Sequence, residues 1–300
     1  MHPVARISGF TFSFIAAALL LGSIYGLAHS APHFATGWSL GLAAFFGTLG
    51  LIQIANRVAD RFPRRMASVI HWTHAMTFEA LAVLAAGLLR PTHHLPSHRA
   101  AVGSPTGRPI LLIHGYLHDS SAWTYLKRKL QQAGFGPIYC LNLGYPFRSI
   151  RDYGEKVVQK AEHIEKETQR HDLILIGHSM GGLVSSWYAT RLAKRGTVTD
   201  VITIGSPLAG THVAKFGLGR DAREMELGSA LVRELQEEIR KSDPTRFYHI
   251  GTKTDQLVIP NTSAIVEGHP ERQFIVEDIG HLTLLFSPRI ANTIKTWLQN

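Results

Sequence analysis

One five-residue segment constrains the fold of this 300-residue chain more than any other. Residues 177–181 read Gly-His-Ser-Met-Gly, directly after the apolar run 173–176, and a stretch that permits a helix begins at residue 182. A serine between two glycines at a strand-to-helix turn is the pattern of a nucleophile elbow, in which a strained backbone presents the hydroxyl above the sheet. The segment predicts Ser179 as a nucleophile. A glycine-rich turn that carries an idle serine is the alternative.

Beyond residue 109 the chain alternates short apolar runs with helical patterns. The predicted strands are 110–113, 138–143, 173–176, 201–204, 247–250 and 274–276, and the predicted helices include 122–133, 152–170 and 288–298. Continuous apolar strands that alternate with helices are typical of a parallel sheet covered on both faces. The sequence therefore predicts an α/β fold for residues 109–300, with 208–242 inserted as a lid. For most of the apolar residues in that segment, packing against the core is the preferred explanation.

An elbow serine needs a histidine base, which comes last along the chain in this kind of site. His281 follows the predicted strand 274–276 and leads toward the last helix, so it is the expected base. His269 precedes that strand and is the competitor. His249 lies inside a strand pattern, and we expect it to be a packed residue.

The histidine in turn needs an acid that orients it. Asp255 follows the strand 247–250, and the carboxyl ends of parallel strands are where α/β sites are built. Asp278, three residues before His281, is the weaker alternative.

Two backbone amides are expected to stabilise an oxyanion. One belongs to Met180, the residue after the serine, and the other to Tyr116, in the loop after the first strand. Gly115 would let this loop turn close to the substrate. His114 is expected to support the loop.

The N-terminal third is apolar and contains two long uncharged runs, 7–28 and 38–55. Runs of about twenty residues can cross the hydrocarbon core, so both are predicted transmembrane helices. A cleaved signal peptide is the alternative for the first. A third run, 72–89, contains Glu79, which would cost about 2.5–3.5 kcal/mol at the centre of a lipid-exposed helix. We favour a span here too, with an interfacial helix as the alternative.

Basic residues set the expected orientation. Arg6 precedes the first run, and four arginines lie between residues 57 and 65, which predicts a cytoplasmic location for both segments. If 72–89 spans, the catalytic part faces the other side. The expectation is a multi-pass protein of a bacterial inner membrane, with a periplasmic catalytic domain joined by a linker at 91–108. His93, His94 and His98 in this linker are expected to be solvated, without a metal.

The net charge of +9 suggests either nucleic acid or an anionic membrane surface as a partner. Before residue 109 there are eight arginines and two acids, and the remaining 23 basic and 20 acidic residues nearly balance. An excess of positive charge beside apolar runs argues for a membrane surface, and no nucleic-acid motif is present. The single cysteine, Cys140, excludes an internal disulfide and is expected to be buried.

Several segments together resemble a known family. Residues 111–115, 177–182, 205–211, 251–255 and 280–282 are similar to conserved blocks of bacterial triacylglycerol lipases of the α/β-hydrolase fold, and 228–235 resembles their lid region. The resemblance covers about 109–300. It implies a Ser179, Asp255 and His281 triad, oxyanion donors at Tyr116 and Met180, and no cofactor. No disulfide pair or dedicated calcium site is identified, and the N-terminal third (1–90) has no counterpart in the soluble members.

The expected function is that of a membrane-anchored serine carboxylic ester hydrolase acting on a lipid or other acyl ester, as a lipase, esterase or phospholipase. An acyltransferase that uses the same acyl-enzyme is one alternative. A non-catalytic membrane interaction protein is the other. The sequence leaves the acyl chain, the head group and the oligomeric state open.

Overall fold

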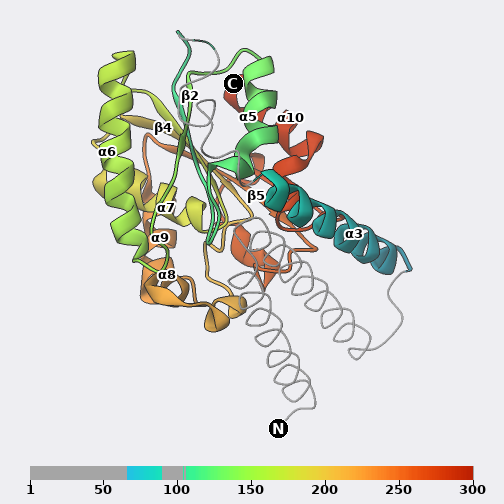
Figure 1. Ribbon diagram of the computed structural model, residues 1–300. Helices are drawn as coiled ribbons and strands as arrows, with labels where there is room; N and C mark the ends of the chain where they lie inside the picture. Colours follow the sequence, from blue (N-terminus) through green and yellow to red (C-terminus); the bar gives the residue numbers. More distant parts are fainter. Residues whose placement is uncertain (1–65, 90–103, 105, 300) are drawn as a thin grey trace, which may run out of the picture.

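The computed structural model describes residues 66–89, 104 and 106–299 (Figure 1). The runs 7–28 and 38–55, and most of the predicted linker 91–108 with its three histidines, lie outside the described residues.

A six-stranded parallel sheet lies at the centre of the described chain, in the order β2-β1-β3-β4-β5-β6. The strands are β1 (Ile110–Ile113), β2 (Ile138–Leu141), β3 (Leu173–His178), β4 (Val198–Ile204), β5 (Arg246–Thr252) and β6 (Gln273–Val276). The chain adds β2 on one side of β1 and all later strands on the other. The order therefore reverses between β1 and β3, and a crevice at such a point is where open α/β sheets bind ligands.

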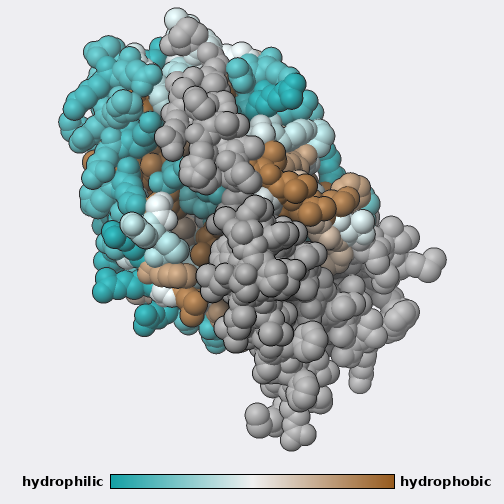
Figure 2. All heavy atoms as spheres, viewed as in Figure 1, coloured by the Kyte–Doolittle hydropathy of each residue, from teal (hydrophilic) through white to brown (hydrophobic). Residues whose placement is uncertain are grey.

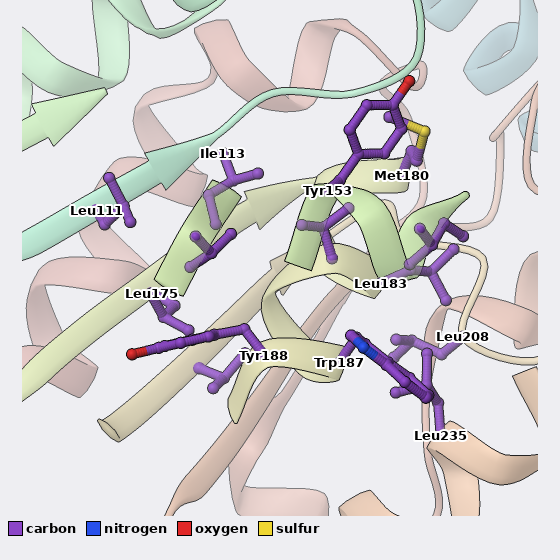
Figure 3. Close-up of a cluster of buried hydrophobic side chains, with 14 of the residues drawn as sticks. Leu111, Ile113, Tyr153, Leu175, Met180, Leu183, Trp187, Tyr188, Leu208 and Leu235 are labelled. Atoms are coloured by element: carbon purple, nitrogen blue, oxygen red, sulfur yellow. The ribbon is translucent and has the colours of Figure 1, made fainter. Parts of the chain in front are cut away.

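Both faces of the sheet are buried. In β1, Leu111 and Ile113 point into one apolar core, while Ile110 and Leu112 point into the other. Figure 3 shows part of the first core, where Trp187 of the helix after β3 lies near Leu235 from a later helix. Because successive side chains of a strand alternate between two apolar cores, the strands read as continuous apolar runs.

Helices cover each face (Figure 1). The first core is covered by α6 (Ile150–Thr168), α7 (Met180–Trp187) and α9 (Ala230–Lys241). The second is covered by α3 (Met66–Leu89), α5 (Thr124–Gln132) and α10 (Pro288–Gln299). The shorter elements are η2 (Ser120–Trp123), the π-helical turn η3 (Tyr188–Leu192), η4 (His212–Phe216), α8 (Gly219–Glu224), η5 (Asn261–Ala264), η6 (Pro270–Arg272) and η7 (Thr283–Phe286).

Local side-chain caps explain where two predicted helices differ from the observed ones. The helix expected from residue 152 begins at Ile150, because the Ser149 side chain and Asp152 form a reciprocal capping box. The helix expected from residue 122 begins as the 3-10 turn η2, since the Asp119 carboxylate accepts a hydrogen bond from the amide of Ser121.

The membrane span expected at 72–89 is not shown by the structure. In the described residues, no helix has the length and apolarity that a crossing requires. One face of α3 instead packs on the second core through Ala82, Val83 and Ala86, with Glu79 buried on the same face. The opposite face exposes Phe78, Leu81, Leu84 and Leu88, and hydrophobic side chains gather over α3 in Figure 2. A helix that is apolar on both its packed and its exposed face reads in the sequence like a span.

The segment predicted as a lid, 208–242, contains η4, α8 and α9. The side chains of Leu231, Val232 and Leu235 are buried in the first core, as the packing interpretation expects. Phe216, Leu218 and Leu227 are 55%, 66% and 39% exposed, so these side chains of the segment offer apolar surface to solvent.

Candidate active site

Ser179 occupies a strained turn between β3 and α7. Its φ of 55° and ψ of −127° are unusual for a residue with a side chain, as expected for a nucleophile elbow. Close packing around the turn requires glycine, because a Cβ on Gly181 would lie 2.1 Å from the carbonyl oxygen of Ile113. Met180 is the first residue of α7, so its amide is among the helix N-terminal donors that have no partner within the helix.

The loop after β1 lies directly against the serine. A Cβ on Gly115 would be 2.9 Å from Cβ and 3.4 Å from Oγ of Ser179, so only glycine fits. The amide of Tyr116 follows immediately, and this places the two predicted oxyanion donors on segments that flank Ser179. The Tyr116 hydroxyl also binds the predicted lid segment, donating to the Leu218 carbonyl (2.9 Å) and accepting from the Leu218 amide (3.1 Å).

His114 braces this loop. Its Nε2 accepts a hydrogen bond from the amide of Leu143 at 3.0 Å. A backbone amide can only donate, so Nδ1 carries the proton and donates to the Gly115 carbonyl at 2.9 Å. A neutral His114 with both nitrogens occupied holds the loop, as the sequence predicts.

His281 and Asp255 are brought together from two strand ends. Nδ1 of His281 lies 3.0 Å and 2.9 Å from the two carboxylate oxygens of Asp255, and both residues are buried. Oδ1 of Asp255 also accepts hydrogen bonds from the amides of Leu257 and Val258, both at 2.8 Å. These amides fix the carboxylate, which in turn sets the orientation of the imidazole and keeps its proton on Nδ1.

The surroundings of His281 favour its charged form. Burial lowers the pKa of the imidazole, but the charge and hydrogen bond of Asp255, together with the charge of Glu79, raise it above the ordinary value. The opposite nitrogen, Nε2, is buried and has no hydrogen-bond partner among the described residues. The bond from Ser179 to His281 is therefore not formed in this structure, and such bonds commonly tighten only when substrate is bound.

Three buried side chains near His281 are not singled out by the sequence patterns. His178 donates from Nε2 to the carbonyl of His281 at 3.2 Å, and burial holds the pKa of His178 well below its usual value. Gln256 accepts from the amide of His281 at 3.1 Å. Glu79 accepts from the next two amides, those of Leu282 and Thr283. The one signal in the sequence is Glu79 itself, a lone charge inside an apolar run.

The competing candidates lie elsewhere. The carboxylate of Asp278 pairs with Arg289 instead of the imidazole of His281. His269 is exposed and pairs with Glu271 at 3.1 Å. His249 is buried within β5, where burial lowers its pKa to about 3, so it is the packed residue that its strand position predicts.

No group of three or more metal-ligating side chains occurs within the part of the chain that the structure describes. Cys140, expected to be buried, is partly buried against the second core, and burial raises the pKa of its thiol to about 11, so little thiolate is present at neutral pH.

The chain belongs to the Alpha/beta hydrolase family, whose sequence profile matches residues 110–286. These limits enclose the elbow, Asp255 and His281, but not Glu79.

Solved structures of several activities share the fold. The mature lipase BlEst2 of Bacillus licheniformis is 17% identical, with a TM-score of 0.56 over 65% of this chain and 94% of that one. A monoacylglycerol lipase of Paleococcus ferrophilus is 18% identical, with a TM-score of 0.51 over 67% and 97%. A bromoperoxidase of Bacillus anthracis is 13% identical, with a TM-score of 0.52 over 67% and 94%. At these identities the similarity establishes the fold, and the reaction must be argued from the site.

Proposed function

We propose that this protein is a serine carboxylic ester hydrolase that acts on a lipid or other acyl ester. The observation that carries the proposal is the buried His281–Asp255 pair, with Nδ1 at 2.9 Å and 3.0 Å from the carboxylate oxygens, in the same site as a serine at φ 55°. A serine nucleophile requires a neutral imidazole whose proton is held on the far nitrogen, and Asp255 provides this.

In the proposed reaction, Nε2 of His281 takes the proton of Ser179 as Oγ attacks the ester carbonyl. The amides of Tyr116 and Met180 donate to the oxyanion of the tetrahedral intermediate. The protonated imidazole then gives its proton to the leaving alcohol, which leaves an acyl-enzyme on Ser179. Water, deprotonated by His281, releases the acid by the same steps in reverse. No cofactor takes part.

An apolar rim supports an acyl substrate. Leu117, Phe147 and Leu218 are 40%, 39% and 66% exposed. The Tyr116 ring lies 6.1 Å from the Phe147 ring, and its hydroxyl binds Leu218, so the rim adjoins the loop that supplies the oxyanion donor. Preference for medium or long acyl chains over acetate, with p-nitrophenyl esters as substrates, is the expected result.

Attachment to a membrane through residues 7–28 and 38–55 belongs to the same proposal. Its support is the absence of charge from both runs. The full chain should remain with the membrane fraction after carbonate extraction, and its release would remove this part of the proposal.

Covalent labelling tests the reaction. A fluorophosphonate probe should modify the wild-type chain, and Ser179→Ala should abolish labelling while circular dichroism shows the same fold. Ser185→Ala is a matched control, because Ser185 is a buried serine on α7 that donates to the Gly181 carbonyl at 2.8 Å. Equal labelling of wild type and Ser179→Ala would refute Ser179 as the nucleophile, and no labelling of the wild type would favour a non-catalytic interaction protein.

A further inference from the structure

A buried carboxylate from a helix outside the family match contacts the loop that carries His281. Glu79 lies on α3 and is 1% exposed. Its Oε1 accepts from the Leu282 amide at 2.7 Å, and its Oε2 accepts from the amide and hydroxyl of Thr283 at 3.0 Å and 2.8 Å. Burial raises the pKa of Glu79, but the three hydrogen bonds from Leu282 and Thr283 and the charge of His281 lower it. Three donors directed at two oxygens require acceptors only, so the geometry favours the ionised carboxylate.

The contact fixes the backbone on either side of the imidazole. The amide of His281 donates to Gln256, its carbonyl accepts from His178, and the next two amides donate to Glu79. The first turn of η7 begins at Thr283, so Glu79 caps a short helix that follows His281 directly. A loop held at four consecutive polar groups has little freedom to misplace the side chain between them.

Gly280 gives independent support for this arrangement. A Cβ at this position would lie 2.3 Å from Oε2 of Glu79. The glycine leaves the room that the carboxylate occupies, so the loop is shaped around Glu79.

Glu79 also acts on His281 through its charge. The ionisable groups around the imidazole are Asp255, Glu79 and His178, and His114 and His118 in turn lie near His178. The charges of Asp255 and Glu79 favour the imidazolium, and burial opposes it. Both acids are buried, so water screens them little.

We propose that Glu79 is a positioning residue for the reaction, which holds the His281 loop in place and supplies a second negative charge that stabilises the imidazolium. The assignment rests on the proposed function. It makes α3 a part of the working site, although the family match begins only at residue 110.

The test compares the full chain as wild type, Glu79→Gln and Ala80→Gln. Ala80 is exposed on the same helix, so Ala80→Gln adds the same amide without touching the loop. The titration of His281 is followed by NMR of the ¹³Cε1 resonance, assigned by its loss in His281→Gln. Glu79→Gln should lower the pKa of His281 by about one unit, and Ala80→Gln should leave it unchanged.

Kinetics provide the second readout. Glu79→Gln should lower kcat for a p-nitrophenyl ester about tenfold or more, with a small change in KM, and move the acidic limb of the pH profile to lower pH. Thr283→Val removes one donor but keeps both charges, so it should lower kcat less and leave the pKa of His281 in place. Glu79→Asp, which keeps the charge on a shorter side chain, replaces Glu79→Gln in the test if Glu79→Gln does not fold. In Glu79→Asp, the pKa of His281 should stay near the wild-type value while kcat falls.

The outcomes separate the two proposals. An unchanged His281 titration and kcat in Glu79→Gln, or a kcat that falls only with the folded fraction, would overturn the role of Glu79 and leave the esterase intact. If Glu79→Asp is used instead, a kcat equal to that of the wild type would likewise overturn the positioning role of Glu79. A lowered His281 pKa in a chain that hydrolyses no ester would refute the proposed function and retain the electrostatic coupling.

Discussion

The imidazole of His281 meets the carboxylate of Asp255 through both oxygens, at 3.0 Å and 2.9 Å from Nδ1, although the two residues follow different strands of the sheet. Parallel strands end at the same edge, so the loops after β5 and β6 can bring a base and an acid together. Both side chains are buried, and this makes the pair rigid and hard to replace.

Asp255→Asn should lower kcat by about 10³-fold to 10⁴-fold, because an amide can donate to Nδ1 and so favour the wrong tautomer of His281. Asp278→Asn is the matched control. Asp278 pairs with Arg289, and its loss should change kcat less than about threefold. Steady-state kinetics with a p-nitrophenyl ester measure both, and an equal loss in the two variants would contradict the assignment of the acid.

The pH dependence follows from the raised pKa of His281. The base must be neutral to accept a proton, so kcat/KM should rise with pH through this pKa and be lost as pH falls below it. Because the pKa lies above the ordinary value of 6.5, the midpoint of the acidic limb should also lie above 6.5. A midpoint clearly below 6.5 would show that the opposing effect of burial prevails.

Gly115→Ala should lower kcat about 100-fold, because the new methyl group would lie 2.9 Å from Cβ of Ser179 and displace the loop that carries the Tyr116 amide. Gly134→Ala provides the contrast. No heavy atom lies within 4 Å of the added Cβ, but φ is +83°, so it should cost about 1 kcal/mol of stability with little change in kcat. Urea unfolding measures the loss of stability and steady-state kinetics measures the loss of kcat. A large loss of kcat in Gly134→Ala with little loss in Gly115→Ala would be incompatible with the proposed oxyanion site.

Tyr116→Phe removes the hydroxyl that both donates to and accepts from the backbone of Leu218. The variant keeps its backbone amide, so kcat for a short ester should fall less than about threefold, while the free energy of unfolding drops by about 1 kcal/mol. Tyr145→Phe, at a side chain 78% exposed, should change neither quantity. A large loss of kcat in Tyr116→Phe would give the hydroxyl a role in the chemistry.

The sheet, the elbow and the pairing of Asp255 with His281 follow from local patterns. A strand-to-helix turn around Ser179 and strand ends before Asp255 and His281 are visible within short windows. Fold topology then brings these positions to one edge, so the sequence is sufficient for the main geometry.

Glu79 could not be placed from the sequence in the same way. Its partners are Leu282 and Thr283, 203 and 204 positions away, and no spacing rule connects them. Because both faces of α3 carry apolar residues, the sequence does not show which face packs on the core. From the sequence, the charge of Glu79 is interpreted as an energetic cost to a membrane span, whereas in the structure backbone amides donate to its carboxylate. Contacts of this kind depend on tertiary packing, which periodicity does not report.

The formation of an acyl-enzyme on Ser179 tests the central claim most directly. The wild-type chain is mixed with a p-nitrophenyl ester, quenched in acid within milliseconds, and analysed by intact mass and peptide mapping. We predict an added acyl group on the peptide that contains Ser179, with a matching burst of p-nitrophenol, and neither in Ser179→Ala. Ester hydrolysis that proceeds equally well in Ser179→Ala, or an adduct on another residue, would contradict the account.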